Sequence, residues 1–168
     1  MLGFSTNSLA TSREQIFQAL FDKLKTATFA QPIQGKTTWS GSVRKFVDYA
    51  QIPLEAQPFL AQFEGMPEMY EQPGNRMPPI RMLSARIFGW APNNSGDSDE
   101  LGSRYVTWML EAIEEALGED SGGFGFPGNC TLGNLVQYVK IEGTVLKYPG
   151  DTDTPVAMVS VPVKILWP

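Results

Sequence analysis

The chain has 168 residues, of which 42% are apolar and 18% are charged, and its formal net charge is −5. This length fits one domain with one buried core, and the low charge content fits either ordinary variation in composition or a surface covered by partners. Because affinity for nucleic acids comes chiefly from lysines and arginines on phosphates, the acidic balance argues against a dedicated nucleic-acid binder.

Histidine is absent, and Cys130 is the single cysteine. The lack of histidine removes Ser-His-Asp and Cys-His nucleophiles and the commonest ligand of transition metals, and one cysteine cannot build a cysteine-rich zinc site. We therefore predict no catalytic residues, no metal and no cofactor. One cysteine also forms no internal disulfide, which favours a reducing compartment. The first residues lack the pattern of a secretory signal, and no apolar run approaches membrane-helix length, so we expect no membrane partner.

The first predicted elements are a flexible arm over residues 1–10 and a helix that opens at Thr11 or Ser12. Thr11 with Glu14, and Ser12 with Gln15, both match the capping box that satisfies free N–H groups at a helix start. An apolar stripe at helical spacing follows, and lysines occupy the last turn, where the helix dipole favours cations. The stripe is Ile16, Phe17, Leu20, Phe21 and Leu24.

The middle of the chain predicts strands separated by a long arm. Residues 39–49 allow either a strand or one helical turn. Residues 59–64 and 80–90 alternate between apolar and polar positions, which predicts two strands. Between them, residues 65–79 are rich in proline and glycine, so we expect a loop or an extended hairpin, and such long segments are usually functional or mobile.

The last third predicts a helix over residues 99–117, a glycine-rich hinge over 118–130, and strands over 135–148 and 156–167. Pro162 falls inside the last strand. Because proline cannot donate to a strand ladder, that strand should lie at a sheet edge or carry a bulge.

The predicted fold is one α+β domain over residues 1–168. The turns between paired strands are too short for crossovers, so the sheet should be mainly antiparallel, with about four to five strands. Each helix has one apolar stripe, and the strands have one apolar face. We therefore expect both helices on one face of the sheet.

The hinge contains a G-x-G-x-x-G match at residues 123–128. In a dinucleotide site this pattern follows a strand and opens a helix, whereas here a helix precedes it and a strand follows, so the match predicts no cofactor. The segment is either a mobile hinge or a docking loop in which Phe124 and Phe126 anchor on a neighbouring subunit.

The remaining candidates are acidic residues, the cysteine and the methionines. Glu111, Glu114 and Glu115 share the solvent face of the second helix, with a weak divalent-ion site between subunits as the alternative. Cys130 is interpreted as a structural or surface thiol. The methionines of the arm either fill gaps or contact a partner, because methionine adapts to irregular surfaces. The candidate interaction residues are Arg44, Met66, Met69, Tyr70, Met77, Phe124 and Phe126.

Six segments, taken together and in order, resemble the tail-terminator (tail-completion) proteins of long-tailed bacteriophages. They are residues 13–21 (REQIFQALF), 43–46 (VRKF), 57–60 (QPFL), 110–117 (LEAIEEAL), 132–136 (LGNLV) and 141–143 (IEG). Each phrase is common alone, and the order carries the resemblance, which spans most of the chain.

The resemblance implies a structural virion protein without enzymatic activity, assembled in the bacterial cytoplasm. Such proteins form a ring, typically of six copies, on the last ring of the tail tube, where they stop tube growth and meet the head connector. The implied partners are other copies of the chain, the tail tube protein and the connector or stopper protein, with DNA only as passing cargo. The alternative is another neck or head-completion protein, either a stopper or an adaptor, of the same virion. An enzyme is the least favoured interpretation.

Overall fold

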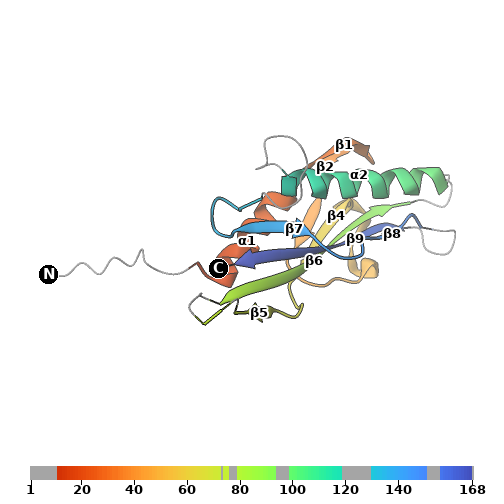
Figure 1. Ribbon diagram of the computed structural model, residues 1–168. Coiled ribbons are helices and arrows are strands. Elements are labelled where there is room, and N and C mark those ends of the chain that lie inside the picture. Colours follow the sequence, from red (N-terminus) through yellow and green to blue (C-terminus); the bar gives the residue numbers. More distant parts are fainter. Residues whose placement is uncertain are drawn as a thin grey trace.

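The computed structural model of the chain describes residues 11–72, 74–75, 79–93, 99–118, 130–150 and 156–167 (Figure 1). The helices are α1 (Arg13–Lys25) and α2 (Asp99–Gly118), and the 3-10 turns are η2 (Tyr49–Gln51) and η3 (Leu54–Ala56). The strands are β1 (Thr28–Ile33), β2 (Lys36–Thr38), β3 (Gly41–Val43), β4 (Phe59–Phe63), β5 (Met69–Glu71), β6 (Ile80–Pro92), β7 (Tyr138–Ile141), β8 (Leu146–Tyr148) and β9 (Val156–Trp167).

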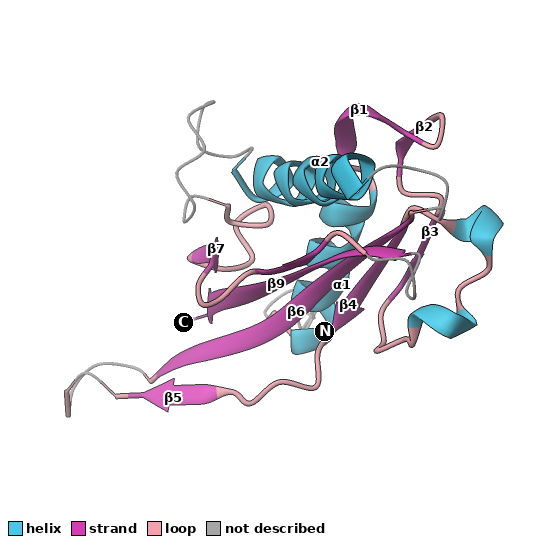
Figure 2. Cartoon of the chain, turned by 90° about the vertical axis from the view of Figure 1, so that its right-hand side faces the viewer, coloured by secondary structure: helices cyan, strands magenta, loops and turns pink. Residues whose placement is uncertain are grey.

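The main sheet of the described residues has seven strands, in the order β3-β4-β6-β9-β7, with β5 beside β6 and β8 beside β9. All its pairs are antiparallel except β3 with β4, which is parallel. Both helices pack on one face of this sheet and share one core with it (Figure 2). The predicted α+β class and helix placement are confirmed. The strand count was too low because β3 and β5 are only three residues long and residues 135–148 supply two strands.

Helix α1 begins where the sequence predicts. Of the two possible capping boxes, the one at Ser12 forms, and the Ser12 Oγ accepts from the Gln15 backbone N–H at 3.2 Å. The Gln15 Oε1 in turn accepts from the Ser12 backbone N–H at 2.8 Å. The predicted apolar stripe is buried along its whole length.

Strands β6 and β9 form the centre of the sheet and pair over twelve residues. Val159, Val161, Val163 and Ile165 on β9 are fully buried on the helix face. Because burial of each such side chain contributes about 1.5–3 kcal/mol, this pair is a main source of stability. The predicted bounds of the last strand are confirmed.

Of the two alternatives predicted for Pro162, the edge position is wrong, because β9 has neighbours on both sides. An irregularity does occur there, in the ladder that β9 forms with β7 and β8. Pro162 is accommodated where the neighbouring ladder breaks: β7 pairs with β9 as far as Val163, and β8 begins at Ser160. Residues 142–145 therefore lie opposite only Val161 and Pro162 of β9 and do not pair with them as a regular ladder. At this break the Pro162 carbonyl accepts from the Glu142 backbone N–H at 3.2 Å, and no ladder donor is needed from the proline.

The predicted strand over residues 135–148 is in fact β7 and β8. Its first residues belong to a turn in which Leu132, Gly133 and Asn134 all have positive φ. Gly143, with φ 123°, then divides β7 from β8. Positive φ is the left-handed region that strands avoid, so the turn and the glycine set the limits of both strands.

The hairpin of β1 and β2 was not predicted. Gln34 and Gly35 form its two-residue turn with φ values of 50° and 74°, as a type I′ hairpin turn requires. Phe29 and Trp39 pack edge-to-face at 4.9 Å, and both are buried in the main core. The hairpin also packs against α2.

Candidate interaction surfaces

The described residues include two exposed surfaces, a strand edge and a sheet face, on which other proteins could bind. No three histidine, cysteine or acidic side chains among them come together as metal ligands. Within the same ranges, no helix has both the length and the apolarity needed to cross a bilayer. Cys130 is fully buried. Glu111, Glu114 and Glu115 lie exposed on α2, as predicted for a solvent face.

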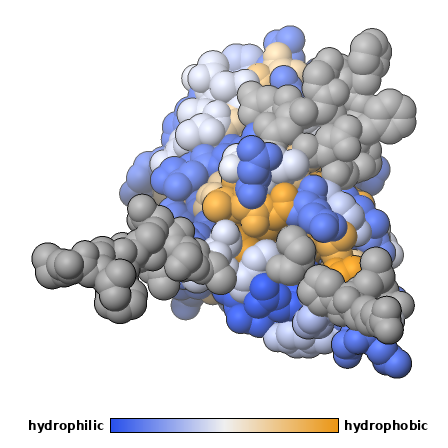
Figure 3. Space-filling model, turned by 60° about the vertical axis from the view of Figure 1, so that its left-hand side comes forward, coloured by the Kyte–Doolittle hydropathy of each residue, from blue (hydrophilic) through white to orange (hydrophobic). Residues whose placement is uncertain are grey.

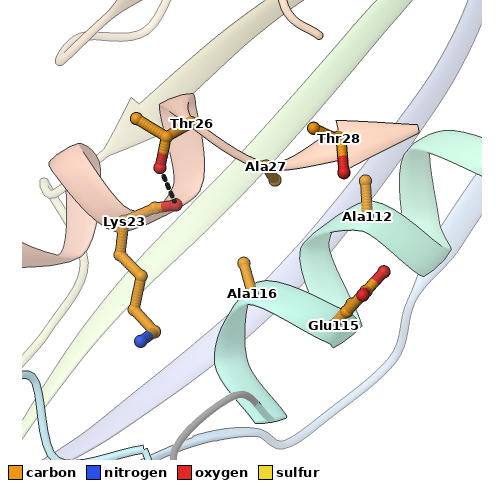
Figure 4. A pocket seen from close by; sticks show the side chains of 7 residues that line it. All are labelled: Lys23, Thr26, Ala27, Thr28, Ala112, Glu115 and Ala116. Carbon is orange, nitrogen blue, oxygen red and sulfur yellow. Dashed lines mark hydrogen bonds between the residues drawn. The ribbon is translucent and has the colours of Figure 1, made fainter. Parts of the chain in front are cut away.

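A hollow of about 230 Å³ lies where the end of α1 meets α2 (Figure 4). Its lining is small side chains with one cation and one carboxylate, namely Lys23, Thr26, Ala27, Thr28, Ala112, Glu115 and Ala116. Figure 4 shows the charged ends of Lys23 and Glu115 pointing away from one another. The Thr26 hydroxyl is within hydrogen-bond distance of the Lys23 carbonyl, at 3.1 Å.

The first contact surface is an arm made of β5 and the start of β6, which extends from the body of the sheet (Figure 2). Met69 and Tyr70 on β5 are 63% and 62% exposed, and Met66 at its base is half-buried. Among the described residues, β5 pairs only with β6, so its other edge is open. The extended-hairpin alternative for residues 65–79 is therefore correct, although Met77 lies outside the described residues.

The base of the arm is tied to α1. The Arg13 guanidinium donates to both carboxylate oxygens of Glu68, at 2.7 and 2.9 Å, and to the Tyr70 hydroxyl at 2.7 Å. These bonds raise the pKa of Arg13 and lower the pKa of the Glu68 carboxyl. Arg81, at the start of β6, stacks on the Trp167 ring at 3.4 Å. The arm is thus anchored at its base while its outer edge is exposed.

Arg44 joins the sheet to α1. Its five N–H donors make five hydrogen bonds, to the carboxylates of Glu14 and Glu64 and to the Gln18 amide oxygen. The carboxylates of Glu64 and then Glu14 raise the pKa of Arg44, and Arg44 lowers the pKa of Glu14. The structure therefore gives Arg44 a role within the subunit, while its predicted role between subunits stays a prediction.

The second contact surface is the sheet face away from the helices, here called the open face. Alternate residues of β4 and β6 place aromatic rings there, and the neighbouring segment adds one more; they are Phe46, Phe59, Phe63, Phe88 and Trp90. Phe88 stacks on Trp90 at 5.4 Å between ring centroids, and Phe46 is 60% exposed. This face is only partly covered, by the segment that contains η2 and η3.

Three cationic side chains from adjacent strands lie on the open face beside the aromatic rings. They are Arg86 on β6, Lys164 on β9 and Lys140 on β7, here called the cation row. Lys140 forms an ion pair with Glu142 at 2.9 Å. Sequence reasoning missed the row, because each member alone is an ordinary polar position of an alternating strand.

Other exposed apolar side chains are spread over the surface. Figure 3 shows an apolar area among hydrophilic side chains on the side of the molecule where β9 ends. Besides Phe46, Met69 and Tyr70, the large exposed apolar residues are Leu54 and Leu146. The predicted docking residues Phe124 and Phe126 lie outside the described residues, so their role stays a prediction.

No protein-family model matches the chain, and no curated protein matches it.

Proposed function

We propose that the chain is a structural subunit of a long-tailed bacteriophage, a tail terminator. Six copies form a ring on the last ring of the tail tube, stop its growth and join the tail to the head connector. The proposal starts from the ordered resemblance of six segments. The single α+β domain, with its open edge strand and only partly covered sheet face, agrees with a subunit that works through contacts.

The observation that carries the proposal is the anchored arm. An edge strand presents unpaired N–H and C=O groups that can pair with another chain, and monomeric proteins usually protect such edges. Strand β5 instead exposes Met69 and Tyr70, and methionine and tyrosine are residue types enriched in interfaces. Because Arg13 fixes the base of the arm, little order has to be gained on binding. Its partner is another copy, the tube protein or the connector.

The acidic charge fits a protein through which DNA passes. A net charge of −5 repels the phosphate backbone, so DNA is cargo and not a ligand. The proposed location is the neck of the virion, after assembly in the bacterial cytoplasm, and no membrane partner is proposed.

The test is electron microscopy of a lysate in which the parental phage carries a stop codon in this gene. Tails of abnormal length beside full, tailless heads are the expected result. Normal-length free tails beside heads that have lost their DNA would assign the protein to the head side of the neck, as a stopper or adaptor. Intact virions would refute both assignments.

A further inference from the structure

We infer that the open face of the sheet receives helix α2 of a second copy of this chain, with the cation row against the carboxylates of that helix. The inference rests on the proposed ring of identical subunits and names the contact that joins neighbouring copies. It is carried by two sets of charges that form no ion pair within the described residues: Arg86 and Lys164 on the open face, and the exposed glutamates of α2.

Two cations of the open face, Arg86 and Lys164, have no carboxylate partner among the described residues. Arg86 donates to the Ser160 hydroxyl at 2.9 Å, and Lys164 donates to the Ser84 hydroxyl at 2.8 Å. Both serines are buried, at 1% and 4% exposure, and neither cation contacts a carboxylate in the described part of the chain. A half-buried cation that contacts only a neutral hydroxyl is well placed to bind an anion from outside.

The row also contains a repulsive pair. Lys140 and Lys164 are directly opposite one another on β7 and β9, with both side chains on the open face. Like charges directly opposite on one face destabilise a sheet. An acidic partner would relieve this repulsion. Glu142 already relieves part of it through its ion pair with Lys140, whereas Lys164 has no such relief.

The matching anions lie on the outer face of α2. Glu111, Glu114 and Glu115 are exposed, and spacings of three and four residues place them on one side of the helix. They occupy its C-terminal end, where the helix dipole disfavours negative charge, and its last turn carries no basic residue. In the part of the chain that the structure describes, none of the three forms an ion pair.

The spacings on the two sides agree. Arg86 and Lys164 occupy diagonal positions on adjacent strands, which lie about 7–8 Å apart, and carboxylates three or four residues apart on a helix are about 5–6 Å apart. Long side chains bridge that difference easily. Contact between the sheet of one copy and the helix of the next would cover the second face of the sheet with a helix, as α1 and α2 already cover the first.

This contact joins two different surfaces, so it leaves one free sheet face and one free helix in any pair of copies. Such a head-to-tail contact repeats from copy to copy, and it gives a closed ring where the rotation between neighbours closes. Phe46, at 60% exposure beside the row, adds apolar area that a neighbouring copy would bury. The contact therefore leaves free surfaces to which further copies can bind, as a ring requires. An isologous dimer uses the same surface on both copies and leaves none.

A single-stranded nucleic acid is the other occupant that cations beside aromatic rings would suggest. Here the rings already pack on one another: Phe88 stacks on Trp90, and Phe46 lies edge-on to Phe63 and Phe88. Few ring faces are therefore free for the bases of a nucleic acid to stack on. The chain is also acidic overall, which opposes a polyanion but suits a copy that presents a local acidic helix.

The test is a charge exchange in the full chain. The helix variant carries Glu111→Lys and Glu114→Lys, and the sheet variant carries Arg86→Glu and Lys164→Glu. A control variant carries Asp48→Lys and Glu55→Lys, which are exposed carboxylates outside both the cation row and α2. The helix and control variants each raise the net charge of −5 by four, so they are matched in charge.

Light scattering after size-exclusion chromatography gives the molar mass of each protein over a concentration series, at low and at high salt. The wild type and the control should assemble alike, and less strongly at high salt. The helix variant should assemble more weakly by about tenfold or more, with an unchanged or higher melting temperature. The sheet variant should also lose assembly. Equimolar mixing of the two variants should restore it, because alternating copies again pair opposite charges.

An assembled helix variant, or a mixture that stays monomeric while both components melt cooperatively, would overturn the inference. So would a wild type that remains monomeric throughout, or one that binds a labelled single-stranded oligonucleotide through Arg86 and Lys164. If the sheet variant fails to fold, the helix variant and its control still decide, since their substitutions are at exposed positions. A charge-dependent assembly together with normal tails from the stop-codon phage would refute the tail-terminator function but not this contact. Assembly that does not depend on these charges, together with abnormal tails from the stop-codon phage, would refute this contact but not the tail-terminator function.

Discussion

Replacing Arg44 by alanine tests how strongly one guanidinium holds α1 against the sheet. The side chains of Arg44 and Glu64 are 19% and 18% exposed, whereas Glu14 is 74% exposed. The bonds to Glu64 should therefore dominate, because exposed ion pairs contribute little. Hydrogen bonds to charged groups contribute about 1.5–3 kcal/mol, and the pair lies near solvent, so we expect Arg44→Ala to lower the free energy of unfolding by about 2 kcal/mol. That loss corresponds to a melting temperature lower by about 4–8 °C for a chain of this size.

Urea unfolding with calorimetry gives both quantities, and a double-mutant cycle with Glu64→Gln isolates the pair. The cycle should show a coupling of about 1 kcal/mol or more. Arg44→Lys keeps the charge but loses the planar fork, so it should restore only part of the stability. Should Arg44→Ala move the melting temperature by less than about 1 °C, or should the cycle show no coupling, the network would be a surface arrangement without a role in stability.

Three further predictions concern stability. Gly102→Ala should destabilise the protein by about 1–3 kcal/mol, although alanine favours helices, because the added Cβ would lie 2.0 Å from the Pro149 carbonyl oxygen. Gln62→Met should raise the free energy of unfolding by about 1 kcal/mol in a urea titration, because the fully buried Gln62 Oε1 has no hydrogen-bond partner. The free energy of unfolding should fall as the pH drops below about 5, because Arg13 lowers the pKa of Glu68 in the folded protein below its ordinary 4.5. As the pH falls, Glu68 therefore takes up its proton at a higher pH in the unfolded chain than in the folded protein, which favours unfolding. Arg13→Ala should flatten this part of the pH profile.

The two substitutions at buried positions, Gly102→Ala and Gln62→Met, have matched controls. Ser103→Ala changes the exposed neighbour of Gly102 on the same helix and should leave the melting temperature nearly unchanged. Gln51→Met places the same side chain at an exposed position and should not stabilise the protein. A stable Gly102→Ala protein would show that α2 can move away from the Pro149 carbonyl. A destabilised Gln62→Met protein would show that the Gln62 bond to the Phe17 carbonyl, at 2.9 Å, outweighs the unpaired oxygen. An unchanged acid limb in Arg13→Ala would place the pH dependence elsewhere.

The elements with strong local signals were predictable. Helix α1 has both a capping box and a full apolar stripe, so its start and its buried face followed from the sequence. Strand β9 has an apolar residue at every second position from Ala157 to Trp167, and its bounds were predicted correctly. In both cases local preference and tertiary packing favour the same structure, which is the condition under which sequence reasoning works.

The elements that were missed depend on partners distant in sequence or on weak turn signals. Strand β1 buries only Phe29 and Ile33 of its six residues and contains Pro32, so its pattern resembles a loop. Its turn is Gln-Gly, which lacks the asparagine or aspartate that usually marks a type I′ turn. The central position of β9 could not follow from Pro162, because the break that accommodates the proline is in the neighbouring ladder and not in its own strand.

The same reasoning explains why the candidate interface could not be predicted from local patterns. Arg44 belongs to one of the family-like segments and was expected to contact a partner, yet all of its donors are used inside the subunit. Arg86, Lys140 and Lys164 come from three strands, and only the register of the sheet brings them into one row. A polar residue on the outer face of a strand is consistent with contact to water as well as with contact to another protein. A contact to another protein is favoured over contact to water where the fold supplies no opposite charge for the side chain. For Arg86 and Lys164, the described residues supply only serine hydroxyls.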